Sequence, residues 1–152
     1  MSMVRSSRHT GIVVRDIENS LRFYRDILGL ELTTRACERG AYIERVVGLA
    51  GAVVDWAKLR TPDGYIVELL QYRSHPDTAS HAETSRVNRL GCSHLALTVF
   101  DLQAVHSALI RQGLLCNSEP QRSPDGKVQV LYAHDPDGAI LELVEELPNP
   151  YK

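Results

Sequence analysis

The stretch His9-Thr-Gly-Ile-Val-Val-Arg-Asp-Ile17 has a second copy in this chain, His94-Leu-Ala-Leu-Thr-Val-Phe-Asp-Leu102. Both copies read His-x-small-aliphatic-x-Val-x-Asp-aliphatic. Further along each half lies a second matched pair, Pro62-Asp-Gly-Tyr-Ile-Val-Glu-Leu69 and Pro136-Asp-Gly-Ala-Ile-Leu-Glu-Leu143, which reads Pro-Asp-Gly-x-x-x-Glu-Leu. Two related motifs in the same order in each half indicate an internal duplication, which predicts two copies of one structural module.

The composition limits the classes of partner. The 152 residues suffice for one ordinary domain or two small fused modules, and 43% of them are apolar. The net charge is -2 and the charges are scattered, so neither a nucleic acid nor a membrane surface is expected as a partner. The N-terminus lacks the apolar centre of a signal peptide. Three cysteines, Cys37, Cys92 and Cys116, have no disulfide or metal-binding spacing, which favours a cytoplasmic location.

Each half predicts the same order of elements, giving an α+β fold. A strand over 9–14 leads through Asp16, a helix N-cap, into a helix that ends at Gly29. In the second half, a strand over 94–99 leads through Asp101 into a helix that ends at Gly113. Further strands are expected at 30–36, 41–47, 52–60 and 65–72, and in the second half at 114–118, 127–134 and 139–145. A third Pro-Asp-Gly, at residues 124–126, is interpreted only as a hairpin turn.

These elements divide the chain into four parts. The first module is expected over 1–72 and the second over 91–146. Between them, residues 73–90 are polar with little to bury, and we interpret them as a linker. Residues 147–152 form a C-terminal tail.

The repeated histidines and glutamates are the candidate functional residues. Side chains alternate between the faces of a strand, so Glu68 and Glu142 are expected between aliphatic neighbours on their strands. A buried ionised glutamate is costly unless it is paired or bound to metal, and neither strand face carries a neighbouring Lys or Arg in sequence. His9 and His94 each precede a small residue by two positions, which predicts open space beside the imidazole. Two imidazoles and two carboxylates suit one divalent ion of Zn, Ni, Co, Mn or Fe.

A structural role is the alternative for each of these residues taken singly. One strand histidine is more often a core or surface residue than a ligand, and one glutamate after a turn is more often solvated. The recurrence of all four at equivalent repeat positions favours a shared metal site. For His75, His81, His106 and His134 nothing recurs, and the structural interpretation is kept.

The pattern resembles the vicinal oxygen chelate superfamily, which includes glyoxalase I, extradiol dioxygenases and bleomycin-resistance proteins. The resemblance covers about residues 8–146 and rests on the motifs at His9, Glu68, His94 and Glu142. It implies two tandem βαβββ modules that form a curved mixed sheet around a metal cleft, often in a homodimer. It also implies that these four residues are the metal ligands, with an enolate as the intermediate of the reaction.

Two departures distinguish this chain from glyoxalase I itself. That family usually has Arg where this sequence has Val13, and Asn where it has Tyr72. Both departures argue against glutathione as the substrate. Glu68 in turn disfavours methylmalonyl-CoA epimerases, which usually have Gln at that position.

The sequence therefore predicts a metal-dependent isomerase, epimerase or lyase acting on a small carbonyl or hydroxy-carbonyl substrate. Glu142 or Glu68 would carry the proton, with Glu142 preferred. Two alternatives stay open: an Fe(II)-dependent extradiol-type dioxygenase and an antibiotic-binding resistance protein. Whether the site forms within one chain or across a dimer also stays open.

Overall fold

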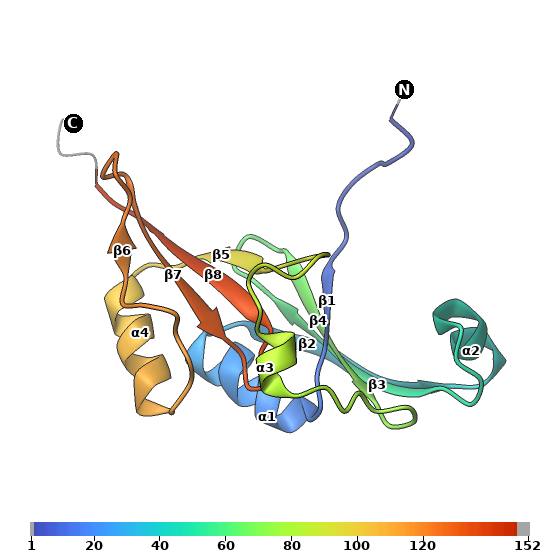
Figure 1. Ribbon diagram of the computed structural model, residues 1–152. Coiled ribbons are helices and arrows are strands. Elements are labelled where there is room, and N and C mark those ends of the chain that lie inside the picture. The colour runs from blue at the N-terminus through green and yellow to red at the C-terminus, as the bar shows by residue number, and fades with distance from the viewer. Residues whose placement is uncertain (1, 149–152) are drawn as a thin grey trace. The chain divides into compact units, whose positions relative to one another are not determined.

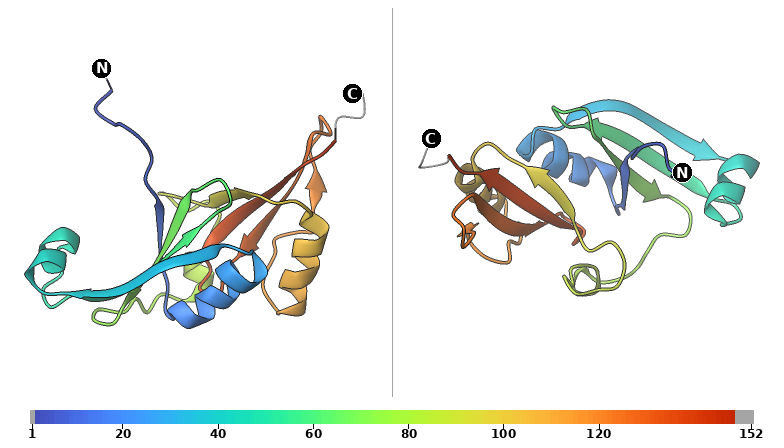
Figure 2. Two further views of the ribbon diagram at one scale, coloured as in Figure 1. Left: turned by 180° about the vertical axis from the view of Figure 1, so that it is seen from behind. Right: turned by 90° about the horizontal axis from the view of Figure 1, so that it is seen from above.

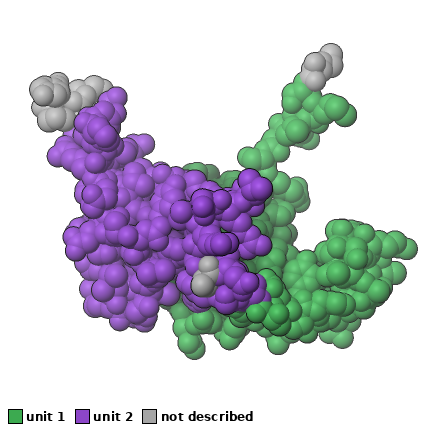
Figure 3. Space-filling model, in the orientation of Figure 1, with its two compact units in different colours: residues 1–78 green, residues 79–152 purple. Residues whose placement is uncertain are grey.

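The structure is a computed structural model that describes residues 2–148. The chain divides into two compact units, residues 1–78 and 79–152, hereafter unit 1 and unit 2 (Figure 3). Each unit contains one four-stranded mixed sheet. In the described part of the chain, no helix is long and apolar enough to cross a membrane.

Unit 1 is built on the sheet β1-β4-β3-β2, with β1 parallel to β4 and the other neighbours antiparallel (Figure 1). Its elements are β1 (Thr10–Val13), α1 (Ile17–Leu21) continuing as the π-helical turn η1 (Arg22–Ile27), β2 (Glu31–Arg39), α2 (Ala41–Val47), β3 (Val53–Arg60) and β4 (Ile66–Tyr72). Figure 2 shows that β2 and β3 extend as a long hairpin with α2 at its end.

Unit 2 repeats this arrangement in the sheet β5-β8-β7-β6. Its elements are α3 (His81–Thr84), β5 (Leu95–Thr98), α4 (Leu102–Arg111), β6 (Gln121–Arg122), β7 (Val128–His134) and β8 (Ile140–Glu146). β5 is parallel to β8, as β1 is to β4. Apart from α2 and α3, each unit has the order strand, helix, three strands, so the predicted α+β fold with two tandem βαβββ modules is confirmed.

The duplication extends to the register of the strands. Gly11 lies opposite Glu68 in unit 1, and Ala96 lies opposite Glu142 in unit 2. Each histidine of the repeat lies two residues before that small residue and therefore on the same face of the sheet as the glutamate. The sheet thus brings together residues about sixty or fifty positions apart in the chain.

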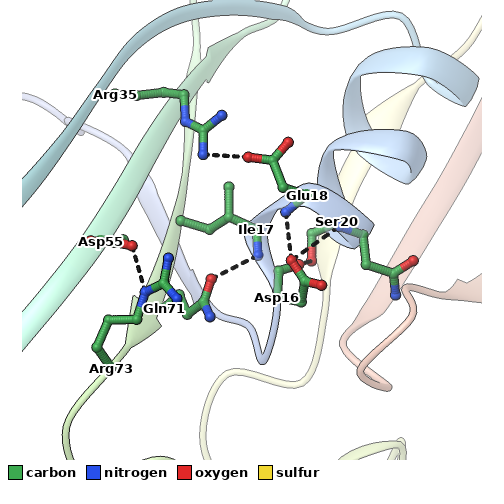
Figure 4. Close-up of polar contacts among 9 residues, drawn as sticks. Asp16, Ile17, Glu18, Ser20, Arg35, Asp55, Gln71 and Arg73 are labelled. Atoms are coloured by element: carbon green, nitrogen blue, oxygen red, sulfur yellow. Dashed lines mark hydrogen bonds and ion pairs between the residues drawn. The ribbon is translucent and has the colours of Figure 1, made fainter.

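Helices α1 and α4 begin as predicted. The Asp16 carboxylate accepts hydrogen bonds from the backbone N–H groups of Glu18 and Asn19 (Figure 4). The Asp101 carboxylate accepts one from Ala104. These contacts satisfy N–H groups that have no partner inside a helix, so both N-cap predictions are confirmed.

A second capping contact comes from the last strand of each sheet. The Gln71 side-chain oxygen accepts a hydrogen bond from the N–H of Ile17, 3.0 Å away (Figure 4). Glu145 does the same for Leu102 at 2.8 Å. Each helix is therefore fixed to the strand of its own unit that carries the repeated glutamate, Glu68 or Glu142.

The core of each unit lies between the helix and one face of the sheet. In unit 1 it includes Leu21, Tyr24, Leu59 and Leu69, and in unit 2 Leu102, Leu109, Leu141 and Leu143. The side chains of Glu68 and Glu142 point away from these cores, because they alternate with the buried leucines along β4 and β8. Each glutamate is therefore presented on the more open face of its sheet.

Two predicted strands were wrong. Residues 41–47 form helix α2, because Ile43 and Val47 lie one helical turn apart and pack toward Ala52 and Val54. Gly48 ends this helix in the left-handed conformation, with a φ of 74°. Residues 114–118 form no strand; only an isolated bridge joins Cys116 to Ala133.

The segment 73–90, expected as a linker, contains the short helix α3. The Ser80 hydroxyl and the Glu83 carboxylate form its capping box. Thr84 donates a hydrogen bond of 2.7 Å to the carbonyl of Asp137, next to the last turn of unit 2. Most of the expected tail, from residue 149 onward, lies outside the described residues.

Candidate metal centre

His9 and Glu68 meet in unit 1. The His9 Nε2 atom lies 3.0 Å from Glu68 Oε2, and the Glu68 side chain is only 13% exposed. Glu68 extends from the middle of β4, while His9 lies just before β1, the parallel neighbour of β4. The contact thus depends on the parallel pairing of two strands that lie at opposite ends of unit 1 in the chain, with α1, η1, β2, α2 and β3 between them.

His94 and Glu142 meet in the same way in unit 2. The His94 Nε2 atom lies 3.2 Å from Glu142 Oε2, and the Glu142 side chain is 27% exposed. The other ring nitrogen, Nδ1, is 2.7 Å from the Ser93 hydroxyl. A partner on Nδ1 fixes the orientation of an imidazole and directs Nε2, here toward Glu142.

Both pairs have the geometry that two ligands of one metal ion require. Ligand atoms about 2.0–2.2 Å from a metal are about 3 Å apart at right-angled positions and about 3.4 Å apart at tetrahedral positions. The observed Nε2–Oε2 separations of 3.0 and 3.2 Å match this spacing. Within residues 2–148, however, no three His, Cys, Asp or Glu side chains gather into one group. Each unit therefore contains two candidate ligands, and both their metal binding and the convergence of all four stay predictions.

Glu68 has a cationic neighbour that the sequence did not reveal. Lys58 lies directly opposite Glu68 in the β3–β4 pair, and its Nζ atom is 3.5 Å from Glu68 Oε1. The inference that no Lys or Arg adjoins these glutamates was therefore wrong for unit 1. That inference considered neighbours along one strand, whereas Lys58 comes from the adjacent strand. A metal ion is consequently not the only available compensation for the charge of Glu68.

The equivalent position in unit 2 holds Tyr132. It lies opposite Glu142 in the β7–β8 pair, and its ring centroid is 5.1 Å from that of His94. The two units thus match in His and Glu and differ at the position that faces the glutamate. One carboxylate has an ammonium group beside it, and the other has a phenol.

The space expected beside His9 is partly filled. A side chain at Gly11 would meet Leu70 Cδ1, since an added Cβ would lie 3.1 Å from that atom. The small residue therefore makes room for Leu70 of β4. The two positions that differ from glyoxalase I lie in different surroundings. Val13 is exposed, whereas Tyr72 packs against the cluster of Ile43, Ala52 and Val54.

The remaining histidines are not part of either pair. His134 is buried, and its Nε2 atom lies 2.6 Å from Asn117 Oδ1. The His81 ring lies 6.0 Å from it, centroid to centroid. Burial, followed by the nearby His81, lowers the pKa of His134 below its ordinary value. The three cysteines are free, as expected from their spacing.

Comparison with known families decides the relationship that these motifs suggested. The family model described as Glyoxalase/Bleomycin resistance protein/Dioxygenase superfamily matches residues 6–143. The chain belongs to this superfamily. The match spans the two histidines and two glutamates of the repeat and both sheets except the end of β8, so the resemblance seen in the sequence is confirmed.

Individual relatives agree with this assignment. A protein of Vibrio parahaemolyticus named probable lactoylglutathione lyase is 25% identical over 90% of this chain and 88% of its own length. A Synechocystis protein of the same name is 26% identical over 90% and 92%. A crystal structure of a glyoxalase family protein from Bacillus cereus is 30% identical, with a TM-score of 0.86 over 97% of this chain and 99% of that one. These relatives support a lyase of glyoxalase type without defining one reaction.

Lys58 and Tyr132 could have been found from the sequence through the turns. In unit 1 the N–H of Thr61 bonds to the carbonyl of Tyr65 across Pro-Asp-Gly, and in unit 2 Asp135 bonds to Ala139 in the same way. Counting outward from either pair fixes the register of the two strands. The count places Lys58 opposite Glu68, and Tyr132 opposite Glu142.

Proposed function

We propose that this protein is a metal-dependent lyase or isomerase of glyoxalase type that acts on a small carbonyl or hydroxy-carbonyl compound through an enolate. The observation that carries the proposal is the pair of His–Glu contacts at 3.0 and 3.2 Å, at equivalent positions of two units. His9, Glu68, His94 and Glu142 are the proposed ligands of one divalent ion. When bound, that ion supplies Lewis-acid stabilisation of a developing oxyanion.

The residues of the chain have distinct tasks in this proposal. The imidazoles of His9 and His94 bind through Nε2, and Ser93 holds the His94 ring in position. Glu142 takes the proton from the substrate carbon. It is the more exposed of the two glutamates and faces Tyr132, whereas Glu68 is paired with Lys58. Because Glu68 already has Lys58 as a partner, Glu142 is preferred as the base.

The expected metal content follows from the same count of ligands. Each chain carries two imidazoles and two carboxylates for this purpose, so one divalent ion per chain is expected whether the ligands come from one chain or from two. We propose a homodimer in a reducing cytoplasm, in keeping with the free cysteines. The substrate of the lactoylglutathione lyase relatives is not transferred to this chain at 25–26% identity.

Metal analysis of protein purified without oxygen tests the proposal. One Zn, Ni, Co or Mn ion per chain is expected, together with its loss in His9→Ala and in His94→Ala. Turnover only with Fe(II), accompanied by oxygen consumption, would instead support a dioxygenase. Tight binding of an intact antibiotic without turnover would support a resistance protein.

Mixing the two alanine variants decides how the site is assembled. If His9 and Glu68 of one chain meet His94 and Glu142 of a second chain, a mixed dimer contains one site with four intact ligands. Refolding His9→Ala and His94→Ala together would then restore part of the bound metal. A site formed within one chain would leave every molecule of the mixture deficient.

A further inference from the structure

Lys58 is held in place on the more open face of the unit 1 sheet by two contacts. Its Nζ atom lies 3.5 Å from Glu68 Oε1 and 4.6 Å from the centroid of the Trp56 ring. Trp56 is itself anchored, because its indole N–H donates a hydrogen bond of 3.1 Å to Glu38 on β2. The ammonium group is thus positioned before any ligand arrives, which lowers the entropic cost of using it.

Glu68 divides its two oxygens between different neighbours. Oε2 faces His9 Nε2, and Oε1 faces Lys58 Nζ. The oxygen on the His9 side suits the metal, while the other oxygen is held by Lys58. At 3.5 Å this ion pair is loose, and the Lys58 side chain is one-third exposed. An ammonium group has three donors, so Lys58 retains the capacity to bond a further acceptor.

The charges of the ion, its proposed ligands and Lys58 do not sum to zero unless Lys58 meets an anionic acceptor. In the proposed function, two carboxylates neutralise one divalent ion, and the imidazoles are neutral. Lys58 then adds one positive charge in unit 1. In unit 2 the equivalent position holds Tyr132, which carries no such charge. The excess positive charge therefore belongs to one side of the site only.

We propose that Lys58 recognises a carboxylate group of the substrate, and that the substrate is a small 2-hydroxy- or 2-oxo-carboxylate. This inference rests on the proposed function. Lys58 Nζ donates a hydrogen bond to one carboxylate oxygen of the substrate, and the other substrate oxygens would be left for the ion that His9 and Glu68 would help to hold. Tyr132 stands at the equivalent position of unit 2, so this recognition is assigned to Lys58 of unit 1.

Glycolate and glycolamide test this recognition. Both offer a hydroxyl next to a carbonyl oxygen, but glycolate is an anion, whereas the amide places an N–H₂ donor where Lys58 needs an acceptor. Cobalt(II) serves as the probe ion, because its visible absorption reports both its own binding and a change of ligand. Wild type, Lys58→Met and Lys58→Arg are titrated with cobalt and then with each compound. Arg60→Met is the control, since Arg60 is a neighbouring cation on the same strand that pairs with Glu31.

The expected result is a loss of anion preference that is specific to Lys58. The ratio of glycolate to glycolamide affinity should fall about tenfold in Lys58→Met, as expected for one hydrogen bond between charged groups. Glycolamide and cobalt should bind no more weakly than to wild type. Lys58→Arg should retain most of the preference, and Arg60→Met all of it. An unchanged ratio in cobalt-loaded Lys58→Met would overturn this inference alone. Failure of wild type to bind cobalt would overturn the proposed function and this inference with it.

Discussion

Glu68 and Glu142 occupy the same register position in two separate sheets, each opposite the small residue that follows a histidine by two positions. Across the neighbouring strand, the first faces Lys58 and the second Tyr132. The duplication therefore preserves the His–Glu pair and changes its surroundings. In the proposed function, this difference assigns Glu68 the role of a ligand beside Lys58 and Glu142 the role of the base.

The two glutamine variants should consequently differ. Glu142→Gln should retain the fold, because Gln nearly matches Glu in volume, and should lower turnover by about 10²–10⁴-fold, since an amide cannot accept the proton. Glu68→Gln should retain more activity, because an amide oxygen can still approach the metal. Exchange of the substrate C–H with solvent deuterium measures proton removal directly. Full exchange in Glu142→Gln would reassign the base to Glu68 or to another group.

The helix caps should contribute to stability and leave the metal site unaffected. Asp16→Ala and Asp101→Ala each remove a carboxylate that accepts backbone N–H bonds. Each should lower the free energy of unfolding by about 0.5–2 kcal/mol, measured by urea denaturation. Because neither residue contacts the His–Glu pairs in the contacts described, metal affinity should be unchanged. A variant that lost metal and kept its stability would contradict the capping role.

The Pro-Asp-Gly turn before the last strand should be less tolerant of substitution in unit 2 (residues 136–138) than in unit 1 (residues 62–64). Gly64 and Gly138 have φ values of 92° and 93°, so Ala at either position should cost roughly 1–2 kcal/mol of unfolding free energy. A Cβ at Gly64 would meet nothing within 4 Å, whereas one at Gly138 would collide with the Thr84 hydroxyl. Gly138→Ala should therefore cost about 1–3 kcal/mol more than Gly64→Ala.

A second substitution provides the control for the Gly64→Ala and Gly138→Ala variants. Adding Thr84→Ala to Gly138→Ala removes the obstructing hydroxyl and should recover part of the difference, although it also removes the hydrogen bond to Asp137. Equal losses for Gly64→Ala and Gly138→Ala in urea denaturation would show that α3 does not constrain this turn.

The stability of unit 2 should decline in mild acid because of His134. Burial first, and His81 second, lower the pKa of this buried imidazole. In the unfolded chain a histidine takes up its proton near pH 6.5, while the folded unit binds it only at lower pH. The contribution of neutral His134 to stability is therefore fully present above about pH 6.5 and is lost as the pH decreases toward the folded-state pKa.

Urea denaturation over this pH range measures the effect. The unfolding free energy should depend less steeply on pH in His134→Gln. The same should hold in part for His81→Gln, which removes one cause of the lowered His134 pKa. A slope in His134→Gln equal to that of wild type would assign the acid sensitivity to other groups.

The sequence by itself determined the features that depend on local chemistry and on the repeat. The His and Glu motifs identified the two modules and both members of each pair. Asp16 and Asp101 marked the helix starts, because an N-cap needs only a side chain next to the first turn. The segment 41–47 was misassigned, since its apolar residues fit either a strand or one face of a short helix, and only packing against Ala52 and Val54 selects the helix.

The neighbours across the two hairpins, Lys58 beside Glu68 and Tyr132 beside Glu142, follow from the register that the Pro-Asp-Gly turns set. Only the tertiary structure decided which strands pair in parallel. Parallel pairing of β1 with β4 and of β5 with β8 brings each histidine to its glutamate. No tight turn joins these strands, so their order and register are properties of the folded sheet.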